Sequence, residues 1–228
     1  MMYHAKEAPK SQYLKLHSMI EEICKEADLP KPRVYIVPST NPNAFATGPS
    51  KKKAVVAVTE GILSLLSYDE LKGVLAHELS HIKNRDMLVT TIAATIATTI
   101  SYIASMARFA AIFGGGRDNN RGGSNILYLL VLGILTPLIA MIIQLAISRR
   151  REYLADERGA RLLKNGESLA KALEKLEISN KRNPLRFGNS ATASLWIVNP
   201  FSGRALINLF STHPNIASRV KRLRNFKF

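Results

Sequence analysis

Two histidines separated by three residues are the strongest chemical signal in the sequence. His77 and His81 close the run His-Glu-Leu-Ser-His, with Glu78 directly after the first of them. Residues four apart lie on one face of a helix, with their Cβ atoms roughly 6 Å apart. Two imidazoles at that spacing can bind one Zn²⁺, and a glutamate beside the first ligand can act as general base on a metal-bound water. The run therefore predicts a helical zinc site with Glu78 as the base.

A catalytic zinc site needs a third protein ligand and one open position. The chain has a single cysteine, Cys24, which excludes a cysteine-based site. Glu152 and Asp156 lie four residues apart much further along the chain. We expect Glu152 to be the third ligand and Asp156 to accept a hydrogen bond from a ligand histidine. An exposed, charged start of a helix is the alternative interpretation of this pair.

His213 is the other histidine with a possible chemical role. It precedes Pro214 at the start of a predicted helix. It is either an ordinary residue at a helix start or a hydrogen-bond donor that stabilises the oxyanion of peptide hydrolysis. The sequence contains no Gly-x-Ser-x-Gly run that would support a serine hydrolase.

Two long uncharged stretches separate the two histidines from Glu152 in the sequence. Residues 87–107 and 122–148 contain no formally charged side chain, and a helix needs about 20 residues to cross about 30 Å of hydrocarbon. We predict a transmembrane hairpin over residues 87–148, although two buried core helices would give a similar pattern. Because two crossings return the chain to its starting side, residues 1–86 and 149–228 can form one metalloprotease domain that carries all three ligands.

The basic residues are concentrated at the end of the chain. The net charge is +15, and residues 149–228 hold 17 Lys and Arg against 6 Asp and Glu. Such an excess indicates an anionic partner, either nucleic acid or a membrane surface. Basic residues also flank both outer ends of the hairpin, which places the flanking parts in the cytoplasm against anionic lipid. We expect no nucleic-acid partner, because the sequence contains no zinc finger or aromatic-interleaved basic sheet.

The flanking parts have the patterns of an α+β fold that is mainly α. Ser67 and Glu70 form a capping box, which begins the zinc helix and carries it to about Asn84. Pro214 is placed in the first turn of a basic closing helix. The triple lysine at 51–53 is interpreted as the entry to a strand. The other expected elements are helices over 11–27, 149–164 and 167–179, strands over 34–37 and 54–58, and a short helix capped by Thr59.

The sequence resembles the HtpX-type branch of the M48 zinc metallopeptidases, which are membrane proteases of protein quality control. The resemblance is carried by residues 43–48, 74–82, 148–156 and 211–214, together with Arg219, and it covers nearly the whole chain in the same order. It implies a zincin-like metalloprotease domain with a small sheet, interrupted by the two-helix hairpin. HtpX-like proteins usually carry two further membrane helices ahead of the soluble part, and the sequence shows none before residue 87.

The resemblance also implies roles for individual residues. One Zn²⁺ would be bound by His77, His81 and Glu152, with Glu78 as the catalytic base. The family's aspartate and histidine match Asp156 and His213. Asn43 and Phe45 would border the substrate-binding strand. The implied activity is cleavage of misfolded or damaged membrane proteins on the cytoplasmic side of the cell membrane.

Two other classes of protein fit parts of the sequence. A non-catalytic membrane scaffold that binds zinc structurally would need a fourth protein ligand, and no cysteine lies near the predicted site. A basic nucleic-acid-binding protein would need a motif that reads bases or backbone. The sequence therefore favours the protease over both.

Overall fold

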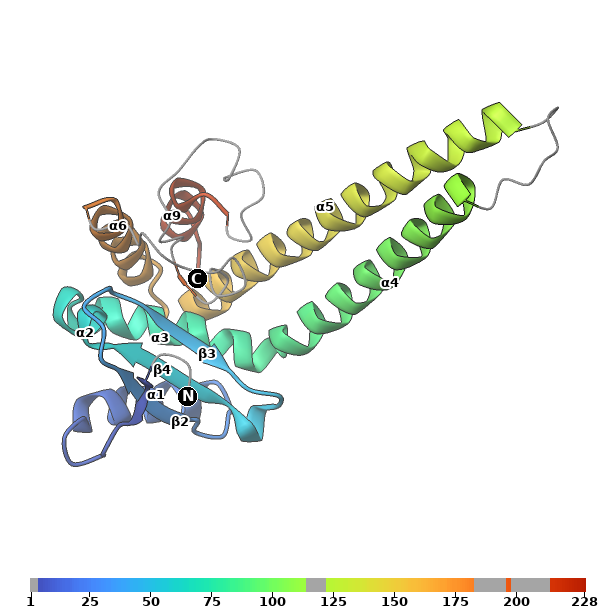
Figure 1. Cartoon of the computed structure of the whole chain (residues 1–228). Helices are drawn as coiled ribbons and strands as arrows, with labels where there is room; N and C mark the ends of the chain where they lie inside the picture. The colour runs from blue at the N-terminus through green and yellow to red at the C-terminus, as the bar shows by residue number, and fades with distance from the viewer. Residues whose placement is uncertain (1–3, 114–121, 183–195, 198–213) are drawn as a thin grey trace. The chain divides into compact units, whose positions relative to one another are not determined.

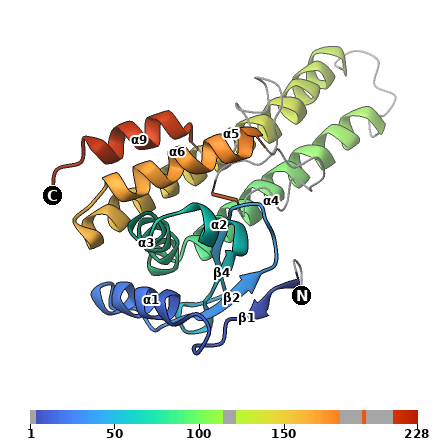
Figure 2. The ribbon, with the colours of Figure 1, turned by 90° about the vertical axis from the view of Figure 1, so that its left-hand side faces the viewer.

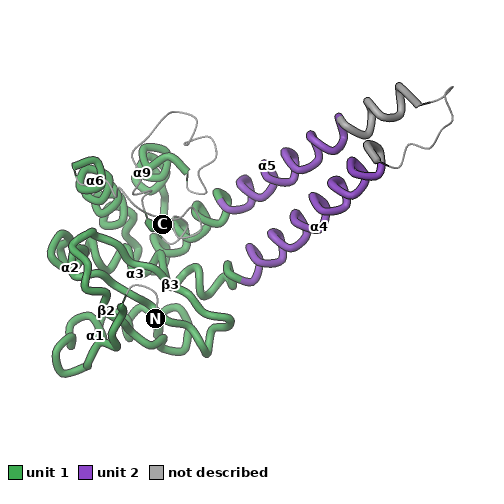
Figure 3. Tube along the Cα trace, viewed as in Figure 1, with its two compact units in different colours: residues 1–87, 149–228 green, residues 88–148 purple. Residues whose placement is uncertain are grey.

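The computed structural model describes residues 4–113, 122–182, 196–197 and 214–228 (Figure 1). For residues 111–113 and 122–130 the structure describes the backbone only. The chain divides into two compact units, one formed by residues 1–87 and 149–228 and the other by residues 88–148 (Figure 3). The first unit thus draws on both ends of the sequence.

A four-stranded mixed sheet forms one layer of the first unit. Its strands lie in the order β1-β2-β4-β3. Strands β2 and β4 are parallel, whereas β1 pairs antiparallel with β2 and β3 pairs antiparallel with β4. The strands are β1 (Lys6–Glu7), β2 (Arg33–Val37), β3 (Ala44–Thr47) and β4 (Val55–Thr59).

Alternating residues of the sheet face two different apolar clusters, as the period of a strand requires. Val34, Ile36, Val56 and Val58 belong to the main core. The intervening side chains form a smaller cluster on the opposite face, against which Phe45 packs. Helices α1 (Leu14–Glu26) and α3 (Tyr68–Asn84) lie against the main-core face (Figure 2).

Two helices of the first unit begin at the N-caps that the sequence predicts. The Thr59 side chain accepts a hydrogen bond from Ile62 N at the start of α2 (Glu60–Leu65). Both reciprocal bonds of the Ser67–Glu70 capping box are present at the start of α3. Helix α3 contacts α6 (Glu167–Arg182), and α6 in turn contacts α9 (Ile216–Arg224). The prediction of an α+β, mainly helical fold is confirmed.

Two local predictions are wrong in detail. The closing helix α9 begins at Ile216 with Asn215 as its N-cap, so Pro214 lies before the helix. Residues Lys51–Lys53 form a 3-10 turn, η2, that leads into β4 at Val55, in agreement with their interpretation as the entry to a strand. The predicted helix at 149–164 is the continuation of the second hairpin helix, since no helix-breaking residue separates them.

The second unit consists of helical segments long and apolar enough to cross a membrane. Helix α4 spans Asp86–Phe113 and helix α5 spans Gly122–Leu163. The most apolar 18 residues within Asp86–Ala110 and within Val131–Leu163 have mean hydropathies of 1.6 and 2.2, and only 6% and 11% of them are buried. Core helices of a soluble protein are mostly buried, so the described part of the chain argues against that alternative.

Candidate active site

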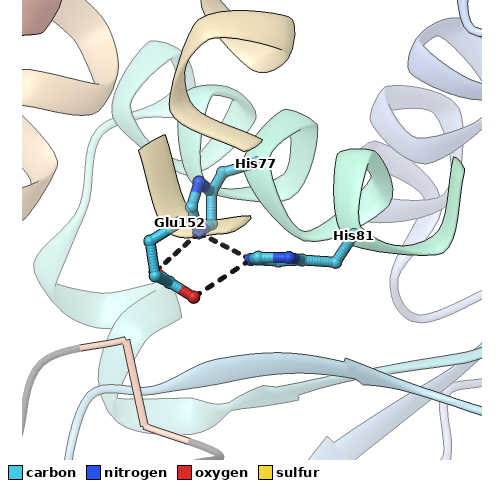
Figure 4. A group of neighbouring side chains, drawn as sticks. All are labelled: His77, His81 and Glu152. Atoms are coloured by element: carbon cyan, nitrogen blue, oxygen red, sulfur yellow. Dashed lines mark hydrogen bonds and ion pairs between the residues drawn. The ribbon is translucent and has the colours of Figure 1, made fainter. Parts of the chain in front are cut away.

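Three side chains converge on one point between α3 and α5 (Figure 4). His77 and His81 share a face of α3, and Glu152 reaches them from α5. Their ligand atoms all lie within 4.8 Å of one another. The two helices come close at Gly159, where an added Cβ would lie 3.1 Å from His77 N. The pairing of Glu152 with the histidines thus depends on a residue without a side chain.

The separations of the three donors fit a tetrahedral metal ion. His81 Nε2 lies 3.0 Å from His77 Nε2 and 3.5 Å from Glu152 Oε1. His77 Nε2 lies 3.6 Å from Glu152 Oε2. Bonds of about 2.0–2.1 Å at a tetrahedral angle place neighbouring ligand atoms about 3.3–3.4 Å apart. The two histidines face different oxygens of Glu152, and with one atom taken from each residue the donors lie within 4.8 Å of one another. The donor set therefore has the chemistry of a zinc site and separations close to those that zinc requires.

The outer nitrogens of both imidazoles face carboxylates. His77 Nδ1 lies 3.0 Å from Asp156 Oδ1, and His81 Nδ1 lies 2.6 Å from Asp86 Oδ2. Because a carboxylate only accepts hydrogen bonds, each Nδ1 carries the hydrogen. In the neutral rings, both Nε2 atoms then carry a lone pair and lie only 3.0 Å apart. A cation between them, either a proton or a metal ion, resolves this repulsion.

The electrostatics of the site favour positive charge. Burial alone would lower the pKa of His77, but Asp156 and Glu152 outweigh it and raise the pKa to about 9. The pKa of His81 is lowered by burial and by the neighbouring His77, since two rings in contact cannot both be protonated. The carboxylates that stabilise a proton on His77 would also stabilise a metal cation at this site.

Arg219 is the most deeply buried charge in the described chain. Its side chain is 0% exposed. Its Nε and Nη2 donate to the two oxygens of Asp156, at 2.8 and 2.7 Å. Its Nη1 lies 3.4 Å from Glu152 Oε2. Arg219 thus holds Asp156 against His77 and neutralises part of the negative charge around the ligands.

Glu78 lies beside the ligands but is held by the sheet. Its Oε2 accepts a hydrogen bond of 2.9 Å from Ala46 N on β3. Glu78 is only 7% exposed, and this burial raises the pKa of its carboxyl group although the nearby histidines lower it. A carboxylate with a raised pKa can both take and return a proton near neutral pH. This environment suits the role predicted for Glu78.

The remaining predicted site residues lie in different surroundings. Asn43 is buried, and its Oδ1 accepts a hydrogen bond from Ile197 N at 3.1 Å. The Phe45 side chain packs on the sheet face opposite to the main core. The strand that contains Phe45 approaches the site through its backbone, at Ala46. His213 lies outside the described residues.

Sequence reasoning missed two residues that contact the site. Asp86 supports His81, and Arg151 forms an ion pair with Asp86. Both lie next to predicted features, directly before the first uncharged stretch and directly before Glu152. A charged residue at each boundary of the hairpin was the available signal, and we interpreted it only as a marker of membrane topology.

Comparisons with known proteins agree with this geometry. The model of peptidase family M48 matches residues 10–227. The chain belongs to peptidase family M48. It is 52% identical over 226 residues to the protease HtpX homolog of Syntrophobacter fumaroxidans, covering 98% of this chain and 80% of that protein. The HtpX homolog of Pyrococcus furiosus is 51% identical over 222 residues, covering 97% and 76%.

A solved structure has a similar fold. The crystal structure of S. mikatae Ste24p superposes with a TM-score of 0.60 at 21% identity, and the match covers 96% of this chain and 52% of Ste24p. The resemblance to HtpX-like M48 proteases predicted from the sequence is therefore confirmed. As a member of M48 with two apolar helices, the chain is a membrane metalloprotease.

Proposed function

We propose that this M48 protein is a zinc-dependent endopeptidase that binds one Zn²⁺ through His77, His81 and Glu152. The observation that carries the proposal is the convergence of the two Nε2 atoms and the Glu152 carboxylate, with one ligand atom from each residue within 4.8 Å of the others. Among the described residues, these three form the one group of histidine, cysteine and acidic side chains that could hold a metal. Three protein ligands leave the fourth position open, as catalysis requires and a structural site does not.

Glu78 is proposed as the general base and acid. Zinc in such a site supplies an acidified water and polarises the scissile carbonyl. Glu78 takes a proton from the attacking water and returns it to the leaving amine. Its hydrogen bond from Ala46 N fixes the carboxylate without using it as a ligand. His213 is proposed to donate to the developing oxyanion.

The substrate is proposed to be a polypeptide that lies along β3. This strand is the last in the sheet as the structure describes it. An extended peptide can pair with an edge strand through backbone hydrogen bonds. Ala46 then links the peptide-binding strand directly to the base. Asn43 and Phe45, at the start of the strand, are proposed to border the bound peptide.

The membrane arrangement is proposed from the charge pattern. Residues 1–86 and 149–228 form the protease domain, and residues 87–148 form a transmembrane hairpin. Lysine and arginine at the outer ends of the hairpin favour a multi-pass protein of the cell membrane with its catalytic part in the cytoplasm. There, the basic 149–228 part would contact anionic lipid. Misfolded or damaged membrane proteins are the proposed substrates, and no nucleic-acid partner is expected.

Metal removal and replacement test this proposal. The purified full chain in detergent is expected to contain about one zinc per molecule and to digest casein. Treatment with a chelator should abolish digestion, and added Zn²⁺ should restore it, because the other catalytic groups remain in place. Casein digestion that persists after the zinc content has fallen below a few per cent would contradict the proposal. A Mg²⁺ addition serves as the control, since Mg²⁺ prefers oxygen ligands.

A further inference from the structure

Asp86 reaches the metal site because helix α3 ends just before it. Arg85 caps α3 in the left-handed conformation, with φ 56° and ψ 41°. In a continuous helix, a residue five positions after His81 would lie about 140° away around the axis. The reversal at Arg85 instead places Asp86 Oδ2 2.6 Å from His81 Nδ1. A left-handed conformation is unfavourable for a residue that has a Cβ atom, so other contacts must hold the turn.

Arg151 provides such contacts. It forms an ion pair with Asp86, and its Nη2 donates a hydrogen bond of 2.8 Å to the carbonyl of Asn84, the last residue of α3. The Arg158 guanidinium donates to the Asn84 side chain. Cations at the carboxyl end of a helix satisfy its free carbonyls and complement its dipole. The side chain of Asp86 is 8% exposed and that of Arg151 is 19% exposed, so this ion pair is shielded from water.

Arg151 is also the residue directly before Glu152. Two consecutive residues of α5 therefore act on the two sides of one imidazole, Glu152 directly and Arg151 through Asp86. Glu152 Oε1 lies 3.5 Å from His81 Nε2, and Arg151 contacts the carboxylate that accepts from Nδ1. Of the three proposed ligands, His81 has the most exposed side chain, at 18% against 2% and 10%. It thus has the least surrounding packing to hold its ring.

We propose that Asp86 is a positioning residue of the metal site, and that its ion pair with Arg151 sets the affinity for Zn²⁺ by holding the His81 ring. This inference rests on the proposed zinc site. Carboxylates behind ligand histidines typically contribute 10–100-fold in metal affinity. Asp86 also fixes Nδ1–H as the tautomer, which leaves Nε2 as the donor.

The same pair has a consequence for the chain outside the site. Asp86 is the first residue of α4, and Arg151 lies three residues after Ser148, the last residue of the second unit. The Asp86–Arg151 pair therefore joins the two points at which the first unit continues into residues 88–148. By linkage, whatever strengthens this pair strengthens metal binding, and bound metal strengthens the pair in return.

The experiment measures zinc affinity of the full chain in detergent by competition with a chromophoric chelator. Asp86→Ala should weaken zinc binding by about 10–100-fold. Arg151→Ala should weaken it less, and Arg151→Lys should recover part of that loss. The double variant should bind zinc no more weakly than Asp86→Ala, because both changes act through one contact. Arg224→Ala is the matched control, since it removes ion pairs with Glu167 and Glu174 on the same unit.

A second readout separates positioning from general destabilisation. The visible absorption of Co²⁺ at saturation reports the arrangement of its ligands, so Asp86→Ala should change the spectrum while Arg224→Ala leaves it as in the parent. If Asp86→Ala does not fold, Asp86→Asn replaces it, since the amide oxygen still accepts from Nδ1 but attracts Arg151 less. Thermal unfolding of each variant shows whether it is folded.

The outcomes distinguish this inference from the proposed function. If the parent binds no zinc, or His81→Ala binds it as tightly as the parent, the zinc site itself is wrong and the inference falls with it. If the parent binds zinc and His81→Ala loses it, but the Asp86 variant keeps the parent's affinity and Co²⁺ spectrum, only the role of Asp86 is overturned.

Discussion

Glu152 and Asp156 lie one turn apart on α5 and make different contacts. Glu152 faces both Nε2 atoms, whereas Asp156 binds His77 Nδ1 and forms a two-bond pair with Arg219. Removing Glu152 takes away a proposed ligand. Removing Asp156 leaves the zinc donors in place. It takes two hydrogen bonds away from Arg219, whose charged side chain is fully buried. The two residues should therefore differ in which property of the protein they control.

We predict that Glu152→Ala lowers zinc affinity more than Asp156→Ala does. The loss for Asp156→Ala should be about 10–100-fold, as is usual for a group behind a ligand. Asp156→Ala should instead cause the larger drop in stability, about 3–5 kcal/mol, because it removes both hydrogen bonds that Asp156 accepts from the buried Arg219 charge. Chelator competition and thermal unfolding measure the two effects. Unchanged zinc content in Glu152→Ala would move the third ligand to another residue.

At the scale of elements, the crossing of α3 and α6 depends on a glycine. A Cβ on Gly73 would lie 2.8 Å from Leu169 N, which is backbone and cannot rotate away. We predict that Gly73→Ala lowers the thermal midpoint by several degrees, since overpacking costs about 1–3 kcal/mol. Without the contact, alanine would stabilise the helix by about 1 kcal/mol. Lys171→Ala, at an exposed position on α6, is the control and should leave the midpoint nearly unchanged. A raised midpoint for Gly73→Ala would show that the two helices can separate freely.

Local signals in the sequence predicted the elements better than the contacts between them. The caps at Thr59 and Ser67 were predictable because each N-cap oxygen meets a backbone N–H two or three residues further on. The His-Glu-Leu-Ser-His spacing likewise predicted which residues share a face of α3. The strand β3 was not predictable from local pattern, because its four residues depend on pairing with β4.

The contacts of Asp86 lay beyond sequence reasoning for a different reason. They depend on a left-handed conformation at Arg85, a residue type that rarely adopts it. The depth of Arg219 was equally hidden, because an arginine in a basic closing helix is normally exposed. Such residues are placed by tertiary packing of α3, α5 and α9, which a linear pattern does not express.

At the scale of the whole molecule, the charge pattern predicts the topology. We expect the link between α4 and α5 to face the outside of the cell and both flanking parts to face the cytoplasm. A membrane-impermeant maleimide should label Asn119→Cys in intact bacterial spheroplasts. Lys25→Cys and Lys171→Cys, at exposed positions of the first unit, should be labelled only after permeabilisation.

The native cysteine provides the control for this labelling. Cys24 is buried, and burial raises the pKa of its thiol to about 11. At pH 7 to 8 almost no thiolate is present, so the parent protein should stay unlabelled until it is denatured. Labelling of Lys25→Cys and Lys171→Cys on opposite sides of the membrane would contradict a hairpin.

The most direct test of the whole account is the effect of Glu78→Gln on two quantities in one preparation. Glutamine can still accept the hydrogen bond from Ala46 N but cannot take a proton from water. We predict that the variant retains about one zinc per chain, as the parent does, while casein digestion falls by about 10²–10⁴-fold. His81→Ala, by contrast, should lose both zinc and activity. A Glu78→Gln protein that retains zinc and digests casein at close to the parent rate would contradict the account.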